Sequence, residues 1–126
     1  MWLGQRRLLL QLFLFVGSIV VTASPAKAGD TVIGIAADSC GTWTADRGNP
    51  YQVTADTEWV LGYVAGVGFL SGSDPLSGLD FGAVTSWVSN YCAARPLDLV
   101  FDAATALAIE LSKRHGVIIQ RTQLPG

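Results

Sequence analysis

The sequence predicts an all-α fold, a small helical bundle held by one disulfide. Three observations support this prediction. Apolar residues recur at helical spacing through the second half of the chain. The chain begins like an exported protein and contains two cysteines. Its 126 residues, 50% of them hydrophobic, correspond to one domain. We therefore expect residues 29–126 to fold as a single helical domain after a signal peptide at residues 1–28.

The first 28 residues have the pattern of a secretory signal peptide. Arg6 and Arg7 precede an apolar stretch at residues 8–23, and Ala26-Lys27-Ala28 is the small-x-small pattern that signal peptidase recognises. A membrane anchor is the alternative, but a span needs about 20 apolar residues and this stretch is shorter. We therefore expect cleavage after Ala28 and a periplasmic or secreted protein that has no membrane contact once the signal is removed.

Cys40 and Cys92 are the only cysteines, and we expect them to form a disulfide. In an oxidising compartment, two cysteines in a small domain usually form a bridge rather than a metal or redox site. The sequence also lacks the Cys-x-x-Cys motif of thiol oxidoreductases. The bridge would close a loop of just over 50 residues, and the chain-entropy model values such a loop at about 4 kcal/mol.

The clearest predicted helix covers residues 97–114. Its apolar positions recur at helical spacing and are Leu97, Val100, Phe101, Ala104, Leu107, Ala108 and Leu111. Asp98 and Asp102 come early, whereas Lys113 and Arg114 come late, which is the order that the helix dipole favours. Gly116 then offers a C-terminal stop.

A second helix is predicted to begin at Asp80, which has a side chain suited to capping. Its apolar stripe contains Phe81, Val84, Trp87, Val88, Tyr91 and Cys92. Arg95 precedes Pro96, and a residue before proline disfavours the α conformation. The short connection that follows predicts that this helix and the next pack as neighbours.

A third helix is predicted over residues 51–70, and its second half is apolar on all sides. A buried strand is the alternative, but twelve apolar residues without alternation favour a helix. Gly62 and Gly66 lie four residues apart on one face. We expect this pair to form a helix-packing notch, into which another helix or a large side chain presses.

The ends of the domain are less regular. Cys40 and Trp43 are three residues apart and suggest a first helix or helical turn at about residues 36–45. Short β-branched runs occur at residues 31–35 and 117–119. These runs could pair with each other or lie as extended tails, and the sequence leaves both conformations open.

Few residues are suited to catalysis or metal binding. His115 is the only histidine, and at a helix C-terminus its charge would favour the dipole. Asp98 and Asp102 are one turn apart, but on the polar face of a helix N-terminus carboxylates are usually solvated. There is no Gly-x-Ser-x-Gly motif, and zinc needs more histidines and cysteines. We therefore predict no catalytic residue, no metal and no cofactor.

The charge of the chain beyond the signal peptide disfavours nucleic acid as a partner. Residues 29–126 hold ten acids and five bases, a net charge of 5 − 10 = −5 with the histidine neutral. Binding to phosphates needs clustered lysine and arginine side chains. The most distinctive side chains are aromatic, and those that we single out as candidate partner-binding residues are Trp59, Tyr63, Phe69, Trp87 and Tyr91. Core packing is the alternative role for each of them.

Several short segments resemble two groups of small exported helical proteins. They are Cys40-Gly-Thr-Trp43, Trp59-Val-Leu-Gly-Tyr63-Val-Ala-Gly66, Trp87-Val-Ser-Asn-Tyr-Cys92, Pro96-Leu-Asp and Ala104–Leu111. The cysteine spacing resembles the acid-stress chaperone HdeA, whose four-helix fold is clasped by one disulfide. The Gly-Tyr-x-x-Gly helix and the late helix opening at a proline resemble the Rap/Tai immunity proteins of type VI secretion. The resemblance implies a four-helix, HdeA-like bundle.

It also implies a non-catalytic periplasmic domain that binds another protein. As an acid-stress chaperone the chain would bind an unfolded client, alone or as a homodimer. Protonating ten carboxylates and His115 would change the net charge of residues 29–126 from −5 to about +6, which favours opening. As an immunity protein, the alternative, the chain would inhibit a secreted toxin with the turn-rich loop at residues 71–78.

Overall fold

The computed structural model describes residues 31–124, and this part of the chain is all-α, as predicted. The α-helices are α2 (Cys40–Ala45), α3 (Pro50–Ser71), α4 (Phe81–Ala94) and α5 (Val100–Arg114). The short 3-10 helices are η2 (Gly34–Ala37), η3 (Asp46–Gly48) and η4 (Arg121–Gln123). Residues 31–124 contain no β-strand, only an isolated bridge between Ser39 and Leu99. The predicted signal peptide lies outside the described residues.

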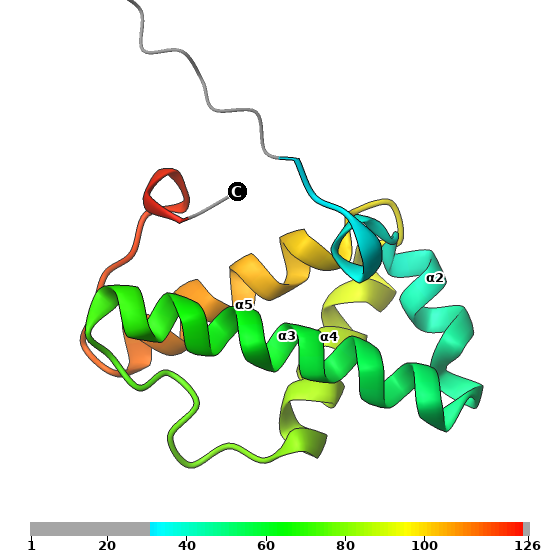
Figure 1. The fold of residues 1–126 in the computed structure, drawn as a ribbon, viewed down its shortest axis with the longest axis horizontal. Coiled ribbons are helices and arrows are strands. Elements are labelled where there is room, and N and C mark those ends of the chain that lie inside the picture. Colours follow the sequence, from blue (N-terminus) through cyan, green and yellow to red (C-terminus); the bar gives the residue numbers. More distant parts are fainter. Residues whose placement is uncertain (1–30, 125–126) are drawn as a thin grey trace, which may run out of the picture.

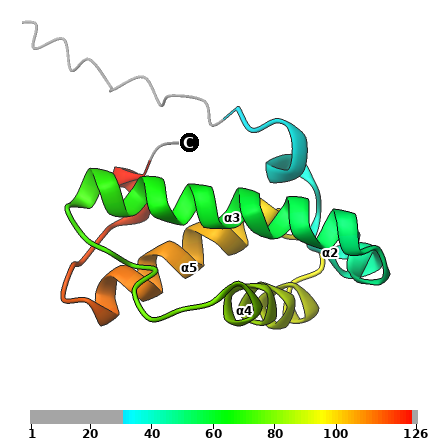
Figure 2. The ribbon, with the colours of Figure 1, turned by 60° about the horizontal axis from the view of Figure 1, so that its bottom comes forward.

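The long helices are arranged as a compact crossed stack. α3 and α5 lie side by side and run in the same direction (Figure 1). α4 crosses them and is seen almost end-on when the other two lie lengthwise (Figure 2). The short α2 packs against α4. After α5 the chain turns back past the C-terminal end of α3. Within residues 31–124, no helix combines the length and the apolar character that a membrane crossing needs.

Local capping explains where α3 begins and ends. The Asn49 side chain accepts hydrogen bonds from the backbone N–H groups of Tyr51 at 3.1 Å and Gln52 at 3.4 Å. Pro50 occupies the first helical position, where its missing N–H costs nothing. Gly72 ends the helix in the left-handed conformation at φ 66°, which glycine adopts without strain. The prediction of a helix over residues 51–70, rather than a strand, is therefore confirmed.

The predicted start of α4 is confirmed, but the predicted start of α5 is wrong by three residues. Asp80 caps α4 by accepting the Ala83 N–H at 2.7 Å. Residues 96–99 do not join α5, because their backbone pairs with the start of α2: the Cys40 N–H donates to the Asp98 carbonyl at 2.8 Å. Leu97, predicted to lie in the apolar stripe, is therefore 93% exposed.

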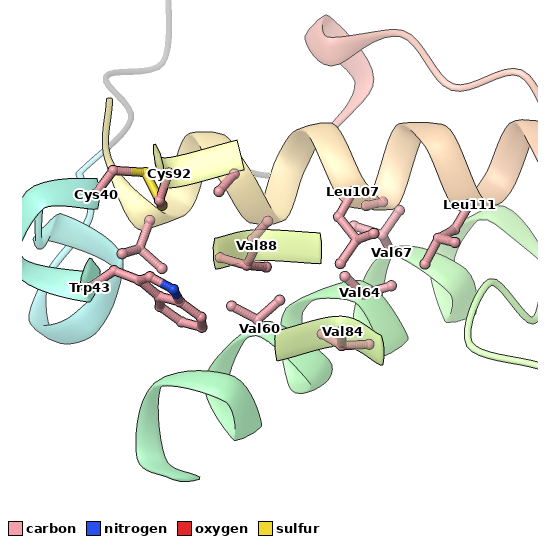
Figure 3. Close-up of a cluster of buried hydrophobic side chains, with 14 of the residues drawn as sticks. Cys40, Trp43, Val60, Val64, Val67, Val84, Val88, Cys92, Leu107 and Leu111 are labelled. Carbon is pink, nitrogen blue, oxygen red and sulfur yellow. A yellow bond between two sulfur atoms is a disulfide. The ribbon is translucent and has the colours of Figure 1, made fainter. Parts of the chain in front are cut away.

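A continuous apolar core runs along α5 between the disulfide and the C-terminal end of α3 (Figure 3). Its labelled members are Cys40, Trp43, Val60, Val64, Val67, Val84, Val88, Cys92, Leu107 and Leu111. The Cys40–Cys92 disulfide is present, as predicted, and joins α2 to α4. Both sulfur-bearing residues are buried, and their Cα atoms are 4.7 Å apart. The bridge therefore forms one wall of the core.

Candidate functional site

The two carboxylates with catalytic spacing are engaged in structural contacts. Asp98 accepts a hydrogen bond from the Tyr91 hydroxyl at 2.8 Å. Asp102 accepts the Leu99 N–H at 3.0 Å and forms an ion pair with Arg121. Burial, and then the bond to Asp98, raise the pKa of Tyr91 to about 12. Across the described residues, no three histidine, cysteine or acidic side chains gather closely enough to hold a metal ion.

His115 lies at the C-terminal cap of α5, where the sequence places it. Its backbone N–H donates to the carbonyls of Leu111 at 3.2 Å and Ser112 at 3.1 Å. The side chain is exposed. Gly116 follows with φ 79°, the left-handed conformation typical of a helix stop.

Four of the five candidate partner-binding aromatics are half-buried in two stacked pairs. On α3, Trp59 and Tyr63 stack with ring centroids 5.6 Å apart. On α4, Trp87 and Tyr91 stack at 5.7 Å. Each pair packs against the core from the side of the bundle. The fifth, Phe69, is different, because it is 87% exposed. The structure therefore divides the predicted set into four packing residues and one surface residue.

The glycine pair predicted to form a packing notch faces open space. A Cβ atom added to Gly62 or Gly66 would meet no heavy atom of the described chain within 4 Å. No helix or side chain of residues 31–124 presses against this pair, so an occupant from outside the chain stays a prediction. The close approach occurs instead at Gly68. A Cβ there would lie 2.9 Å from the Ser73 carbonyl oxygen and closer still to the Pro75 ring.

That contact holds the loop predicted to enter a toxin. Pro75 is buried against Gly68, and the Ser73 N–H donates to the Gly68 carbonyl at 2.9 Å. Leu76 packs against the core. The residues of the loop that stay exposed are Gly72, Asp74, Ser77 and Gly78. The loop is therefore anchored at its middle.

An apolar groove lies between the last turn of α3 and the C-terminal tail. The groove encloses about 260 Å³. Its lining residues are Val67, Leu70, Ser71, Val117, Ile118, Ile119, Gln123 and Leu124. Figure 1 shows the tail, coloured orange to red, turning back around this end of α3. The sequence marks residues 117–119 only as β-branched and does not indicate that they meet α3.

Large apolar side chains stay exposed around the groove. Leu70 and Ile118 line it and are nonetheless 70% and 67% exposed. Phe69 lies beside Leu70 on the same helical turn. A cluster of exposed apolar residues at a concave site is typical of a surface that binds a partner. We therefore regard the groove, rather than the stacked aromatic pairs, as the candidate functional site.

The tail that forms one wall of the groove is held at three points. Val117 donates its N–H to the Ser112 carbonyl at 2.9 Å, and Ile119 is buried. Arg121 forms an ion pair with Asp102 near the start of α5. The hydrogen bond that Arg121 donates to the Asp102 carboxylate raises the pKa of Arg121. The tail is therefore a fixed part of the fold through residue 121.

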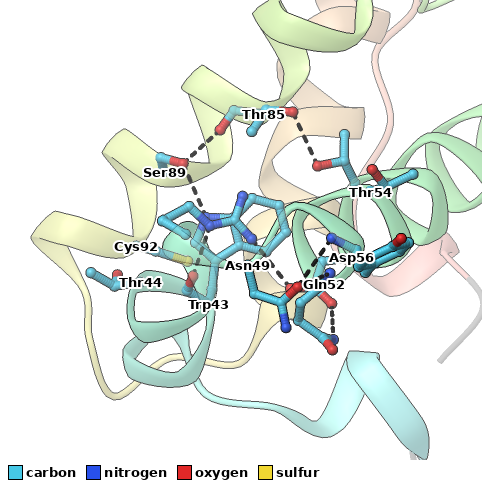
Figure 4. Close-up of polar contacts among 12 residues, drawn as sticks. Trp43, Thr44, Asn49, Gln52, Thr54, Asp56, Thr85, Ser89 and Cys92 are labelled. Atoms are coloured by element: carbon cyan, nitrogen blue, oxygen red, sulfur yellow. Dashed lines mark hydrogen bonds and ion pairs between the residues drawn. The ribbon is translucent and has the colours of Figure 1, made fainter.

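A different kind of cluster lies at the opposite end of α3 (Figure 4). Asp56 is buried and accepts hydrogen bonds from Arg47 at 3.2 Å and Gln52 at 2.7 Å. The Arg47 guanidinium lies 3.8 Å from the centroid of the Trp43 ring. The Trp43 indole N–H donates to the Ser89 hydroxyl at 3.1 Å. Burial raises the pKa of Asp56 and lowers that of Arg47.

This cluster joins three elements of the fold. The hydrogen bonds of the Arg47–Asp56 pair link η3, α2 and α3, and the Asp56 side chain is 4% exposed. Sequence reasoning missed the pair, because nine residues separate Arg47 and Asp56 and neither belongs to a motif.

Comparison of the chain with protein-family models, with curated proteins and with solved structures finds no match. The interpretation of the groove therefore depends on its own geometry and charge.

Proposed function

We propose that the chain is an exported, non-catalytic protein-binding domain that holds a partner polypeptide at the groove between α3 and the tail. The observation that carries the proposal is the exposure of Leu70 and Ile118 at the groove they line. Covering exposed aliphatic side chains removes apolar area from water and so favours binding, and a polypeptide is the occupant that covers an open, surface-running groove.

The use of the polar side chains also supports a binding role. Within the described residues, the acidic pair at residues 98 and 102 and the buried Asp56 are engaged by Tyr91, Arg121, Arg47 and Gln52. A general acid or base has to face a cavity that a substrate enters. The groove wall instead offers aliphatic side chains with one serine and one glutamine.

An HdeA-like role as an acid-stress chaperone is the finer form of this proposal. Its support is a four-helix fold with one disulfide between cysteines 52 residues apart. The change in net charge of residues 29–126 from −5 to about +6 on full protonation would drive opening by self-repulsion. Asp56 opposes opening of the bundle at acid pH, because its raised pKa means that its protonation favours the folded state.

The test of the binding role uses residues 29–126 and a permanently unfolded polypeptide, reduced and carboxymethylated lactalbumin. We expect binding by isothermal titration calorimetry, and we expect the double variant Leu70→Ser/Ile118→Ser to weaken it at least tenfold. The matched control is Leu97→Ser/Ile33→Ser, which removes two aliphatic side chains elsewhere that are still more exposed. Equal loss in both double variants would contradict the assignment of the groove.

The chaperone role has its own test. The binding of a fluorescent apolar dye should rise between pH 7 and pH 2 if acid opens the bundle, and aggregation of an acid-denatured client should fall in parallel. A flat dye signal over this range would remove the acid-stress role and leave the binding role standing. The mass of the exported protein should correspond to a chain that begins at Gly29.

A further inference from the structure

We infer that the groove binds an extended, acidic polypeptide segment, which adds as a strand beside the tail at Val117–Ile119. This inference rests on the proposed binding function and names the chemistry of the partner. Three independent observations support it: the backbone of the tail, the alternation of its side chains and the distribution of charge along the chain.

The backbone of the tail has unused hydrogen-bonding groups. After the Val117 N–H, which donates to Ser112, the next backbone hydrogen bond recorded in the described chain is at Gln120. The N–H and C=O groups of Ile118 and Ile119 therefore have no partner within residues 31–124. Such groups on an extended segment are the template that strand addition uses.

The side chains of the tail alternate as those of a strand do. Val117 is half-buried, Ile118 is exposed and Ile119 is buried. This period of two places Ile119 toward the core and Ile118 toward the solvent side of the groove. A peptide laid beside the tail would present every second side chain to the groove. The specificity of the site would then come from apolar residues at alternate positions.

Charge favours an acidic partner. Residues 111–126 contain Lys113, Arg114 and Arg121 and no acid, so this segment carries +3 with His115 neutral. Residues 29–110 contain two bases and ten acids and carry 2 − 10 = −8. The bases of residues 111–126 flank the tail wall of the groove in the sequence, and the residues that line the groove are themselves uncharged. Arg114 and Arg121 are paired with Glu110 and Asp102, whereas Lys113 is exposed and has no ion pair in the described chain.

The experiment compares three synthetic decapeptides against residues 29–126 by calorimetry in 150 mM salt. The first alternates valine with glutamate, the second alternates valine with lysine, and the third is the glutamate peptide with alternate amide nitrogens methylated. We expect the glutamate peptide to bind at least tenfold more tightly than the lysine peptide. We expect N-methylation of the pairing edge to weaken binding at least tenfold, because the methylated edge cannot join a ladder.

Two variants connect these effects to the groove. Lys113→Glu should abolish the preference for the acidic peptide. Arg95→Glu makes the same change in charge at an exposed site outside the tail, and this variant should still bind the acidic peptide at least fivefold more tightly than the basic one. Leu70→Ser should weaken the binding of both unmethylated peptides, and Leu97→Ser should leave the binding of both unchanged. Circular dichroism and the thermal midpoint of each variant establish that it is folded.

Equal affinity for the acidic and basic peptides would overturn the inferred partner charge. Equal affinity for the methylated and unmethylated glutamate peptides would overturn strand addition. If the unfolded lactalbumin binds through the groove and the acidic peptide does not, only the inference fails. If neither polypeptide binds the folded domain, the proposed function fails with it.

Discussion

The two ends of the bundle differ in how far their large side chains are buried. At the disulfide end, which we define by Cys40, Cys92, Trp43, Arg47 and Asp56, the cysteines, Trp43 and Asp56 are buried. Every ring, cation and carboxylate there contacts another element. At the groove end, formed by the last turn of α3 and residues 113–124, large aliphatic side chains are exposed.

This difference indicates where the domain gains its stability and where it offers a surface. A covalent bridge and the polar contacts of Trp43, Arg47 and Asp56 hold the disulfide end in one arrangement. At the groove end, the tail is joined to the rest of the fold by the Arg121–Asp102 ion pair, the Val117–Ser112 backbone hydrogen bond and apolar contacts. We therefore expect substitutions at the disulfide end to change folding and those at the groove end to change binding.

Removal of the disulfide should have the largest effect. Cys40→Ala/Cys92→Ala opens a loop of about 52 residues, for which the chain-entropy model gives a loss of about 4 kcal/mol in the free energy of unfolding. Urea denaturation followed by circular dichroism measures this loss. The unsubstituted protein under a reducing agent should lose a similar amount. A loss below about 1 kcal/mol would mean that the polar contacts alone hold this end.

Disruption of the Arg47–Asp56 pair should have the second-largest effect on stability. Arg47→Met leaves the Asp56 carboxylate buried with the hydrogen bond from Gln52, and we expect a loss of about 3 kcal/mol in the free energy of unfolding at pH 7. The loss should be smaller at pH 4. The raised pKa of Asp56 means that its stabilising contribution is full at acid pH and decreases as the pH rises through the folded-state pKa.

The double variant Arg47→Met/Asp56→Asn provides the control for this pair. It removes the charge that the single variant leaves unpaired, so it should recover about half of the lost stability and show little dependence on pH. The measurement is the free energy of unfolding in urea between pH 4 and pH 7. A pH-independent loss in the single variant would contradict the assigned role of the carboxylate.

Two glycines of α3 sharpen the comparison, because they should respond with opposite signs. Gly68→Ala forces a methyl group against Pro75 and the Ser73 carbonyl, and we expect a loss of about 1–3 kcal/mol. Gly66→Ala adds a methyl group in open space and should gain up to about 1 kcal/mol from helix propensity. Thermal unfolding of the two variants checks both signs. If Gly66→Ala also abolishes binding of the unfolded client, the exposed glycine pair belongs to the partner surface.

Leu70→Ser should have the smallest effect on folding. Its side chain is 70% exposed, so the free energy of unfolding should change by no more than about 0.5 kcal/mol. Binding of the unfolded client should nevertheless weaken. Leu97→Ser, at 93% exposure, is the matched control and should alter neither quantity. A large loss of stability in Leu70→Ser would show that this residue belongs to the core.

Local signals in the chain were sufficient for most of the fold. Asp80, the residues before Pro96 and the apolar period of residues 100–111 identified α4 and α5, since capping and amphipathic spacing act within one or two helical turns. The start of α5 was wrong because residues 96–99 pair with α2, far away in sequence. Local propensity contains no information on such pairing.

The candidate site depends even more than the fold on contacts between segments that are distant in the sequence. The sequence by itself determined the helical class, the Cys40–Cys92 bridge and the lack of a catalytic motif, because composition, cysteine count and periodicity are properties of the linear chain. Only the tertiary structure decided which aromatics are covered, that Gly62 and Gly66 face open space, and that the tail at residues 117–119 meets the last turn of α3. Burial depends on which distant segments come together, and a groove exists only after they have done so.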